Sequence, residues 1–172
     1  MKKGYIQVYT GNGKGKTTAA FGLALRAVGA GLKVFIAQFM KGIEYSELHA
    51  IERLSDSITL KQYGRKSFIH EQPQKADVDL AILGLNETRA AIQSGKYDII
   101  ILDEANVAVH FKLFPVRKLL TLMDEKPDKV ELVITGRYAA PKVIEKADLV
   151  TEMCEIKHYY QKGVSARKGI ES

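Results

Sequence analysis

The stretch that decides the fold reads Val8-Tyr9-Thr10-Gly11-Asn12-Gly13-Lys14-Gly15-Lys16-Thr17-Thr18. Residues 5–9 form a short apolar run that favours a strand, and residues 17–28 favour a helix, so the glycines fall at a strand-to-helix turn. There the flexible backbone can point successive N–H groups at phosphate oxygens, and the helix N-terminus adds partial positive charge. We therefore predict a phosphate-binding loop, in which Lys16 reaches the outer phosphates and the Thr17 hydroxyl binds a magnesium ion.

One position departs from the standard spacing G-x-x-x-x-G-K-[ST], because Thr10 stands where the first glycine is expected. Gly11 and Gly13 still supply flexible backbone. A surface turn rich in glycine and lysine is the alternative interpretation, but the strand before it and the helix after it favour the phosphate loop. The residues predicted to contact a nucleotide here are Gly11, Asn12, Gly13, Lys14, Gly15, Lys16, Thr17 and Thr18.

The length and composition suit one soluble globular domain spanning residues 1–172, with 46% hydrophobic residues. The net charge of +6 favours an anionic partner: nucleic acid, a membrane surface or a nucleotide triphosphate. A triphosphate suffices, because the basic residues form no long run. No apolar stretch is long enough for an export signal or a membrane span, so we expect a cytoplasmic protein with no membrane partner.

The single cysteine, Cys154, excludes an internal disulfide and a cysteine-based metal cluster, and it is consistent with a reducing cytosol. We expect it to be a small apolar core residue. The four histidines lack metal-ligand spacing, which makes a transition-metal site improbable.

Strands and helices alternate along the rest of the chain. Strands are predicted at 33–39, 58–63, 97–104, 130–134 and 149–156, and helices at 46–54, 77–94, 115–125 and 141–146. The helix over 77–94 should bury Ala81, Leu85, Thr88 and Ile92. The segment 64–74, between the predicted strand 58–63 and this helix, is predicted to be a long loop of the kind that often forms a lid. This pattern predicts an α/β three-layer P-loop NTPase fold with a mostly parallel sheet, of the RecA-like subclass.

Two acidic residues, Asp103 and Glu104, follow the apolar run 99–102. The carboxyl ends of parallel strands face the ligand crevice, so both should lie beside the phosphate loop. One carboxylate can hold magnesium while the other orients a water or also binds metal, and the residues alone do not decide which. An acidic N-cap of the next helix is compatible with both roles.

Arg137 follows the predicted strand 130–134 and should also lie at this edge of the sheet. It either contacts a phosphate or a leaving group, or it is a solvated loop residue. The tail, 157–171, is basic, aromatic and rich in glycine. By composition it is a disordered end, a nucleic-acid patch or a flap over the nucleotide.

Nearly the whole chain resembles the P-loop type of cob(I)alamin adenosyltransferases, the corrinoid adenosyltransferases. The phosphate loop alone indicates only a nucleotide-binding protein, and the later segments narrow the resemblance. The segments that carry it are 11–20, 22–27, Gln38-Phe39-Met40-Lys41-Gly42, Leu102-Asp103-Glu104, Ile134-Thr135-Gly136-Arg137, 147–153, and Lys157-His158 with Gly163, Ala166 and Gly169-Ile170-Glu171.

The resemblance implies that Co(I) of a corrinoid attacks the ribose 5′-carbon of ATP and expels the whole triphosphate. Lys16, Thr17 and Arg137 would then stabilise a leaving group. It also implies that Mg²⁺ or Mn²⁺ is held by Thr17 and Glu104, with Asp103 nearby. Further implications are a separate electron donor that reduces cobalt, and a homodimer.

The chain departs from the family in having no tryptophan, although the family often has one in the Lys-Gly loop and another in the long loop after the third strand. Phe68 stands near the second position, and the resemblance implies that it displaces the lower cobalt ligand. Two other functions are a RecA-like ATPase acting on nucleic acid and a module that binds ATP without turnover. No strand-tracking motif beyond the tail supports the first, so we expect no nucleic-acid partner.

Overall fold

The computed structural model describes residues 2–43, 45–65 and 72–171. Its centre is a six-stranded sheet in which every pair of neighbours is parallel, in the order β3-β2-β4-β5-β1-β6. The strands are β1 (Ile6–Thr10), β2 (Val34–Phe39), β3 (Ile58–Tyr63), β4 (Ile99–Asp103), β5 (Glu131–Thr135) and β6 (Leu149–Glu152).

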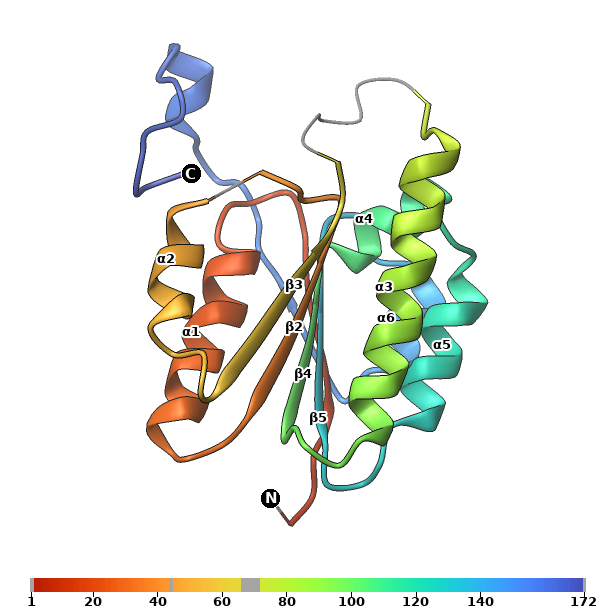
Figure 1. Cartoon of the computed structure of the whole chain (residues 1–172). Coiled ribbons are helices and arrows are strands. Elements are labelled where there is room, and N and C mark those ends of the chain that lie inside the picture. The colour runs from red at the N-terminus through yellow and green to blue at the C-terminus, as the bar shows by residue number, and fades with distance from the viewer. Residues whose placement is uncertain (1, 44, 66–71, 172) are drawn as a thin grey trace.

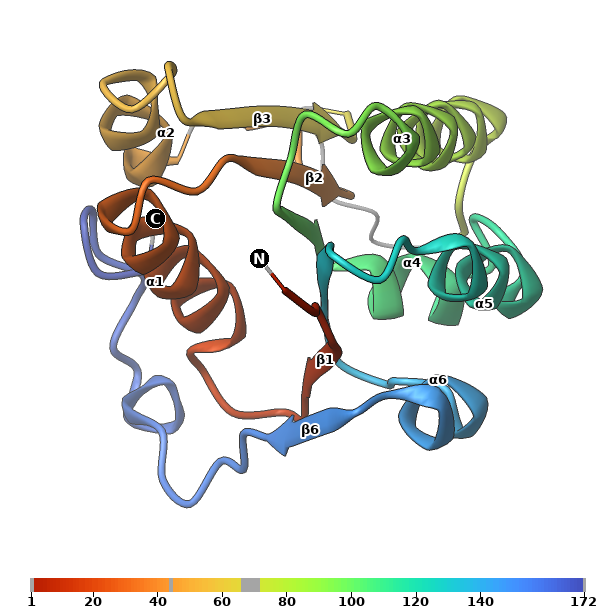
Figure 2. The same cartoon turned by 90° about the horizontal axis from the view of Figure 1, so that it is seen from below.

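Helices cover both faces of the sheet, as Figures 1 and 2 show. On one face lie α1 (Lys16–Gly29) and α2 (Ser46–Glu52). On the other lie α3 (Lys75–Gln93), α4 (Ala105–His110), α5 (Val116–Glu125) and α6 (Pro141–Lys146). The predicted class, an α/β three-layer P-loop NTPase fold, is confirmed. None of the described helices is both long and apolar enough to cross a membrane.

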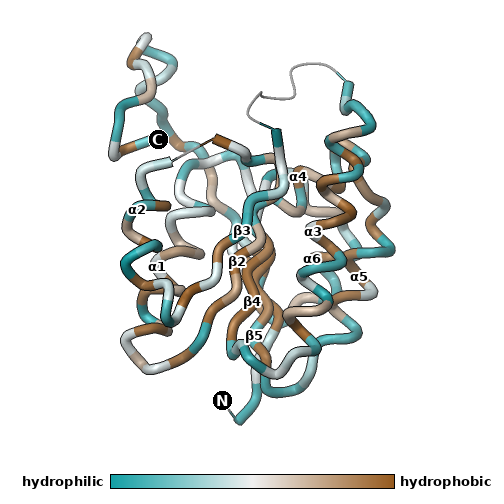
Figure 3. The backbone as a smooth tube through the Cα atoms, in the orientation of Figure 1, coloured by the Kyte–Doolittle hydropathy of each residue, from teal (hydrophilic) through white to brown (hydrophobic). Residues whose placement is uncertain are grey.

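The core consists of two apolar layers, one on each side of the sheet, and the central strands β2, β4 and β5 are correspondingly brown in Figure 3. Ile36, Ile101 and Val133 pack toward α1, whereas their chain neighbours belong to the layer under α3 and α5. Because both faces are covered, the central strands are continuous apolar runs without alternation. The predicted buried face of α3, namely Ala81, Leu85, Thr88 and Ile92, is confirmed.

Two expectations for the C-terminal part are wrong. The last strand ends at Glu152 instead of residue 156, and Ile156 is 94% exposed. Cys154 is exposed and does not belong to the core. Both differences have one cause: β6 is an edge strand whose four residues are all exposed, so the chain beyond it leaves the sheet and does not enter the interior.

Gly84, in the middle of α3, is predicted to be required for packing. A Cβ atom there would lie 2.7 Å from Cγ of Tyr63 and 2.9 Å from Cε1 of Phe39, both atoms of packed rings. Gly84→Ala should therefore lower the free energy of unfolding by about 1–2 kcal/mol, although alanine is the better helix former by about 1 kcal/mol. Urea denaturation measures this change.

Gly29, the last residue of α1, is the matched control, because a Cβ there meets nothing within 4 Å. Gly29→Ala should leave the free energy of unfolding unchanged or raise it by up to about 1 kcal/mol. An equal rise in the free energy of unfolding for Gly84→Ala would show that the Phe39 and Tyr63 rings can move aside without cost.

Candidate functional site: the nucleotide cleft

The candidate site lies at the carboxyl edge of the sheet, where several strands end in strained backbone. Met40 follows β2 with φ 59°, Glu104 follows β4 with φ 60°, and Tyr138 lies just beyond β5 with φ 60°. This left-handed conformation costs a non-glycine residue roughly 1–3 kcal/mol, and it clusters where function requires a fixed geometry. The strain indicates that this edge of the sheet is built around a site.

The predicted phosphate loop joins β1 to α1 at this edge. Gly15 is the N-cap of α1 and has φ 115°, a backbone conformation that is unfavourable for residues with a Cβ atom. Gly13 donates its N–H to the carbonyl of Met153 at 2.6 Å, and a Cβ on Gly13 would lie 2.7 Å from that oxygen. The loop is therefore fixed from behind by the chain that follows β6.

Lys16 points its amine into the curve of this loop. The side chain is 7% exposed, and Nζ donates to the carbonyl of Gly13 at 2.7 Å. Burial lowers the pKa of Lys16, the negative charge of Glu104 opposes that shift, and Arg137 adds to it. This hydrogen bond goes to a neutral carbonyl, so a phosphate would be a better partner for the cation.

Asp103, the last residue of β4, is fully buried and saturated with donors. Its Oδ1 accepts from the Thr17 hydroxyl at 2.9 Å and from the Thr135 hydroxyl at 2.7 Å. Its Oδ2 accepts from Nε2 of Gln38 at 3.0 Å and from Nζ of Lys41 at 2.8 Å. This carboxylate therefore ties β2, β5 and the start of α1 together.

Glu104 differs from Asp103 in both burial and hydrogen bonding. It is the N-cap of α4, but its side chain makes no capping bond. Within the described residues its half-buried carboxylate has no hydrogen bond or ion pair, and it lines the cleft. Burial and the charge of Asp103 raise the pKa of Glu104, while Lys41, Lys16 and Arg137 oppose the rise. Glu104 therefore remains available to a ligand, whereas Asp103 does not.

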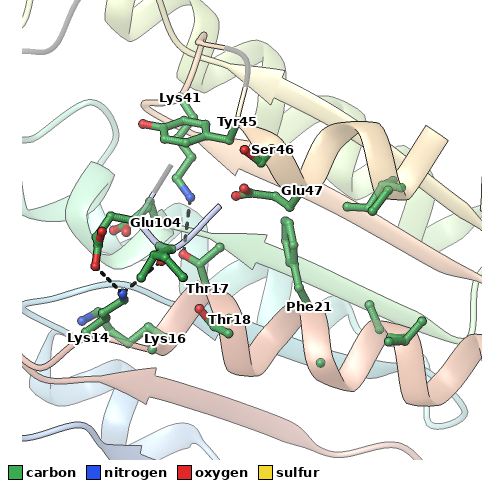
Figure 4. Close-up of a pocket in the computed structure, with 18 of the residues that line it drawn as sticks. Lys14, Lys16, Thr17, Thr18, Phe21, Lys41, Tyr45, Ser46, Glu47 and Glu104 are labelled. Carbon is green, nitrogen blue, oxygen red and sulfur yellow. Dashed lines mark hydrogen bonds and ion pairs between the residues drawn. The ribbon is translucent and has the colours of Figure 1, made fainter. Parts of the chain in front are cut away.

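The phosphate loop and Glu104 line a cleft of about 860 Å³, whereas Asp103 lies buried beneath it. Lys16, Thr17, Glu104 and Arg137 form its polar end, and Figure 4 shows several of these side chains converging there. The rest runs between α1 and α2 and is mostly apolar, lined among others by Phe21, Leu25, Ala50, Ile51 and Leu54. The cleft can thus hold an anionic group at one end and a large apolar surface beside it.

The C-terminal tail folds back onto the mouth of this cleft. After the short 3₁₀ helix Tyr159–Lys162, residues 169–171 line the cleft. Lys14 donates to the Glu171 carboxylate at 2.9 Å and to the Ile170 carbonyl at 3.0 Å. Arg167, Tyr159 and Lys14 together hold the pKa of Glu171 far below its ordinary value. Of the three interpretations of the tail, this docking favours the flap.

Breaking this contact should release the tail. In Glu171→Gln we expect backbone hydrogen exchange of residues 157–168 to be about threefold faster or more at pH 7, because the neutral amide loses its ionic partners Lys14 and Arg167. A lowered pKa stabilises docking above the ordinary glutamate pKa of about 4.3, and that stabilisation is lost as the pH falls through the lowered value. The Ile170 methyl NMR resonance of the wild type should therefore hold its position until the pH falls below about 4.

Glu145→Gln is the control for tail release, because Glu145 is exposed on α6, outside the tail. Unchanged exchange of residues 157–168 in Glu171→Gln would show that the docking does not depend on the carboxylate charge.

Comparison with known proteins decides which family this cleft belongs to. Residues 2–172 match the family described as ATP:corrinoid adenosyltransferase BtuR/CobO/CobP. The chain belongs to this family. It is therefore an enzyme of the corrinoid adenosyltransferase type, which confirms the resemblance that the motifs indicated. The comparisons give no support to the alternative of a RecA-like ATPase acting on nucleic acid.

Individual relatives agree over nearly the whole chain. A corrinoid adenosyltransferase of Pseudomonas aeruginosa is 32% identical over 99% of this chain and 84% of its own length. One of Escherichia coli (strain K12) is 33% identical over 99% of this chain and 86% of its own length. The corrinoid adenosyltransferase CobA of Salmonella typhimurium is 33% identical with the same coverage.

The adenosyltransferase fold brings together most of the residues that the sequence indicated. Those that line the cleft are Asn12, Gly13, Lys14, Gly15, Lys16, Thr17, Thr18, Glu104 and Arg137. Gly11 lies behind the loop, where a Cβ would approach the Met153 carbonyl to 2.5 Å, and Asp103 lies beneath Thr17. Phe68 is outside the described residues.

The apolar lining of the cleft and three polar partners of Asp103 were not predicted from the sequence. Gln38, Lys41 and Thr135 surround the Asp103 carboxylate. The available signal was a polar residue at the carboxyl end of an apolar strand, which holds for Gln38 in β2 and Thr135 in β5. Lys41 follows its strand by two residues and gave no such signal.

Proposed function

We propose that the chain transfers the 5′-deoxyadenosyl group of ATP to Co(I) of a corrinoid and releases inorganic triphosphate. The observation that supports this most is the shape of the cleft, which joins a phosphate-loop end to an apolar region between α1 and α2. A simple nucleotide hydrolase needs room for the nucleotide and a water, whereas this reaction needs room for a macrocycle beside the ribose.

The reaction is a displacement at carbon. Co(I) supplies an electron pair that forms the cobalt–carbon bond to C5′, the C5′–O bond breaks, and its pair leaves with the triphosphate. No proton moves, so no general base is required of the protein. Its tasks are alignment, exclusion of water and oxygen, and stabilisation of the leaving anion. The cobalt must first be reduced by a separate electron donor.

Two cationic side chains, together with the backbone amides of the phosphate loop, would stabilise the leaving triphosphate. Lys16 lies within the loop, next to backbone amides at the N-terminus of α1. Arg137 follows the neighbouring strand β5 at the same edge of the sheet, where it is exposed in the cleft and free to approach the outer phosphates. Both charges act on the group that departs and not on a transferred phosphoryl group.

Mg²⁺ or Mn²⁺ suits the oxygen donors beside the loop. Magnesium sites of nucleotide-binding proteins usually combine one or two protein oxygens with substrate phosphates and waters. We propose the Thr17 hydroxyl and the unpaired Glu104 carboxylate as the protein ligands. When bound, the ion supplies positive charge to the triphosphate oxygens.

The test is an anaerobic assay with ATP and a chemically reduced corrinoid. Formation of an adenosylated corrinoid with equimolar inorganic triphosphate supports the proposal. Production of ADP and phosphate, accelerated by DNA or RNA, would contradict it.

An ATP analogue with a methylene group between the β- and γ-phosphorus sharpens this test. Displacement at C5′ leaves every phosphorus bridge intact, so the analogue should still be a substrate. An enzyme that cleaves the β–γ bridge would be blocked by it. Failure of the analogue to bind is checked separately by competition with ATP.

A further inference from the structure

Lys41 occupies a closed position between the phosphate loop and the acidic strand. Its amine lies 2.8 Å from Oδ2 of Asp103 and 3.4 Å from the Thr17 hydroxyl oxygen. The Tyr45 ring covers it at 5.4 Å from amine to ring centroid. Figure 4 shows the side chain extending toward Thr17 with this ring beside it.

The backbone fixes Lys41 in that position. Met40, just before it, has the left-handed φ of 59° and donates its N–H to the Tyr63 carbonyl at 3.1 Å. Gly42, just after it, packs so closely that a Cβ would lie 2.3 Å from the Gly64 carbonyl oxygen. The turn is thus clamped against the end of β3, and Lys41 is directed inward.

Lys41 forms an ion pair with a fully buried carboxylate. Its side chain is 15% exposed and Asp103 is completely buried. The 2.8 Å ion pair therefore places the Lys41 ammonium directly against a carboxylate that has no access to water.

We propose that Lys41 is the internal counter-cation of Asp103 and closes this carboxylate to divalent metal in the absence of nucleotide. The same pair leaves Glu104 as the acid that is open to a metal, so Lys41 decides which of the two neighbouring carboxylates becomes a ligand. Metal then enters together with the triphosphate. The inference rests on the proposed function only in placing a metal beside Thr17.

The test measures Mn²⁺ binding without nucleotide or corrinoid, by electron paramagnetic resonance and by thermal unfolding. Lys41→Met should bind Mn²⁺ about tenfold more tightly than the wild type, or more, because Asp103 has lost its cation. Without metal its Tm should fall by roughly 5–10 °C, and Mn²⁺ should restore part of that loss, whereas the wild-type Tm should respond little.

Three variants complete the test. Lys41→Met/Asp103→Asn should lose the added Mn²⁺ binding, which assigns the gain to Asp103. Lys61→Met removes the exposed ion pair with Glu87 and should change neither Mn²⁺ affinity nor the metal response of Tm. Lys41→Gln keeps an N–H donor but no charge, and should show the same gain if Lys41→Met fails to fold.

Unchanged Mn²⁺ affinity in both neutral Lys41 variants, or a gain that persists without Asp103, would overturn the inference. Neither result would touch the transfer reaction, because these measurements contain no ATP or corrinoid. A failed transfer assay would likewise leave the Mn²⁺ result standing.

Discussion

Adenosyl transfer by Lys16→Ala is expected to be about 10²–10³ times slower than by the wild type at saturating corrinoid. The Lys16 amine is buried inside the loop and donates to the Gly13 carbonyl, so alanine removes the cation nearest the site of the leaving triphosphate. The hydrogen-bond partner of Lys16 is a neutral carbonyl, so removal of the lysine leaves no unpaired buried anion and the fold should survive. Single-turnover transfer and nucleotide binding are the measurements.

Lys129→Ala is the matched control, since that lysine is exposed before β5, at the opposite end of the sheet. It should transfer at the wild-type rate. If Lys16→Ala also transfers at that rate, the loop does not hold the triphosphate and the assignment of the cleft is wrong.

The largest effect on stability is expected from Asp103→Ala. Removal of this carboxylate leaves the Lys41 ammonium and the donors of Thr17, Thr135 and Gln38 without their acceptor in the interior. We expect the free energy of unfolding to fall by about 3–5 kcal/mol, measured by urea denaturation. Tm should fall by about 10 °C.

Asp124→Ala provides the comparison, because Asp124 also pairs with a lysine, Lys146, but on the surface. Loss of an exposed ion pair should cost at most about 1 kcal/mol. Similar losses for the two variants would mean that the hydrogen bonds of Asp103 contribute little.

The fold could be predicted largely because its signals are local. Buried parallel strands are apolar throughout, and each is followed by an amphipathic helix or a turn residue. The strand order could not be predicted, since it depends on packing between distant segments. The same reason explains why Cys154 and Ile156 were wrongly expected to be buried. A short apolar segment has the same sequence pattern at the edge of a sheet as in the middle, and only the strand order places β6 at the edge.

The site residues also separate into those that a contiguous motif locates and those that depend on distant segments. The phosphate loop is contiguous, so its spacing alone locates Lys16 and Thr17. The unequal environments of Asp103 and Glu104 arise from partners on other strands, with Lys41 62 positions away from Asp103. The tail contact of Lys14 with Glu171 spans 157 positions. No local pattern encodes separations of that size.

The docked tail has a practical consequence for handling the enzyme. Residues 169–171 line the mouth of the cleft, whereas the N-terminal end lies at the far end of the sheet (Figure 1). An affinity tag attached beside Glu171 would crowd the mouth of the cleft, where we propose that the corrinoid enters. Immobilisation through the other terminus leaves that entrance clear.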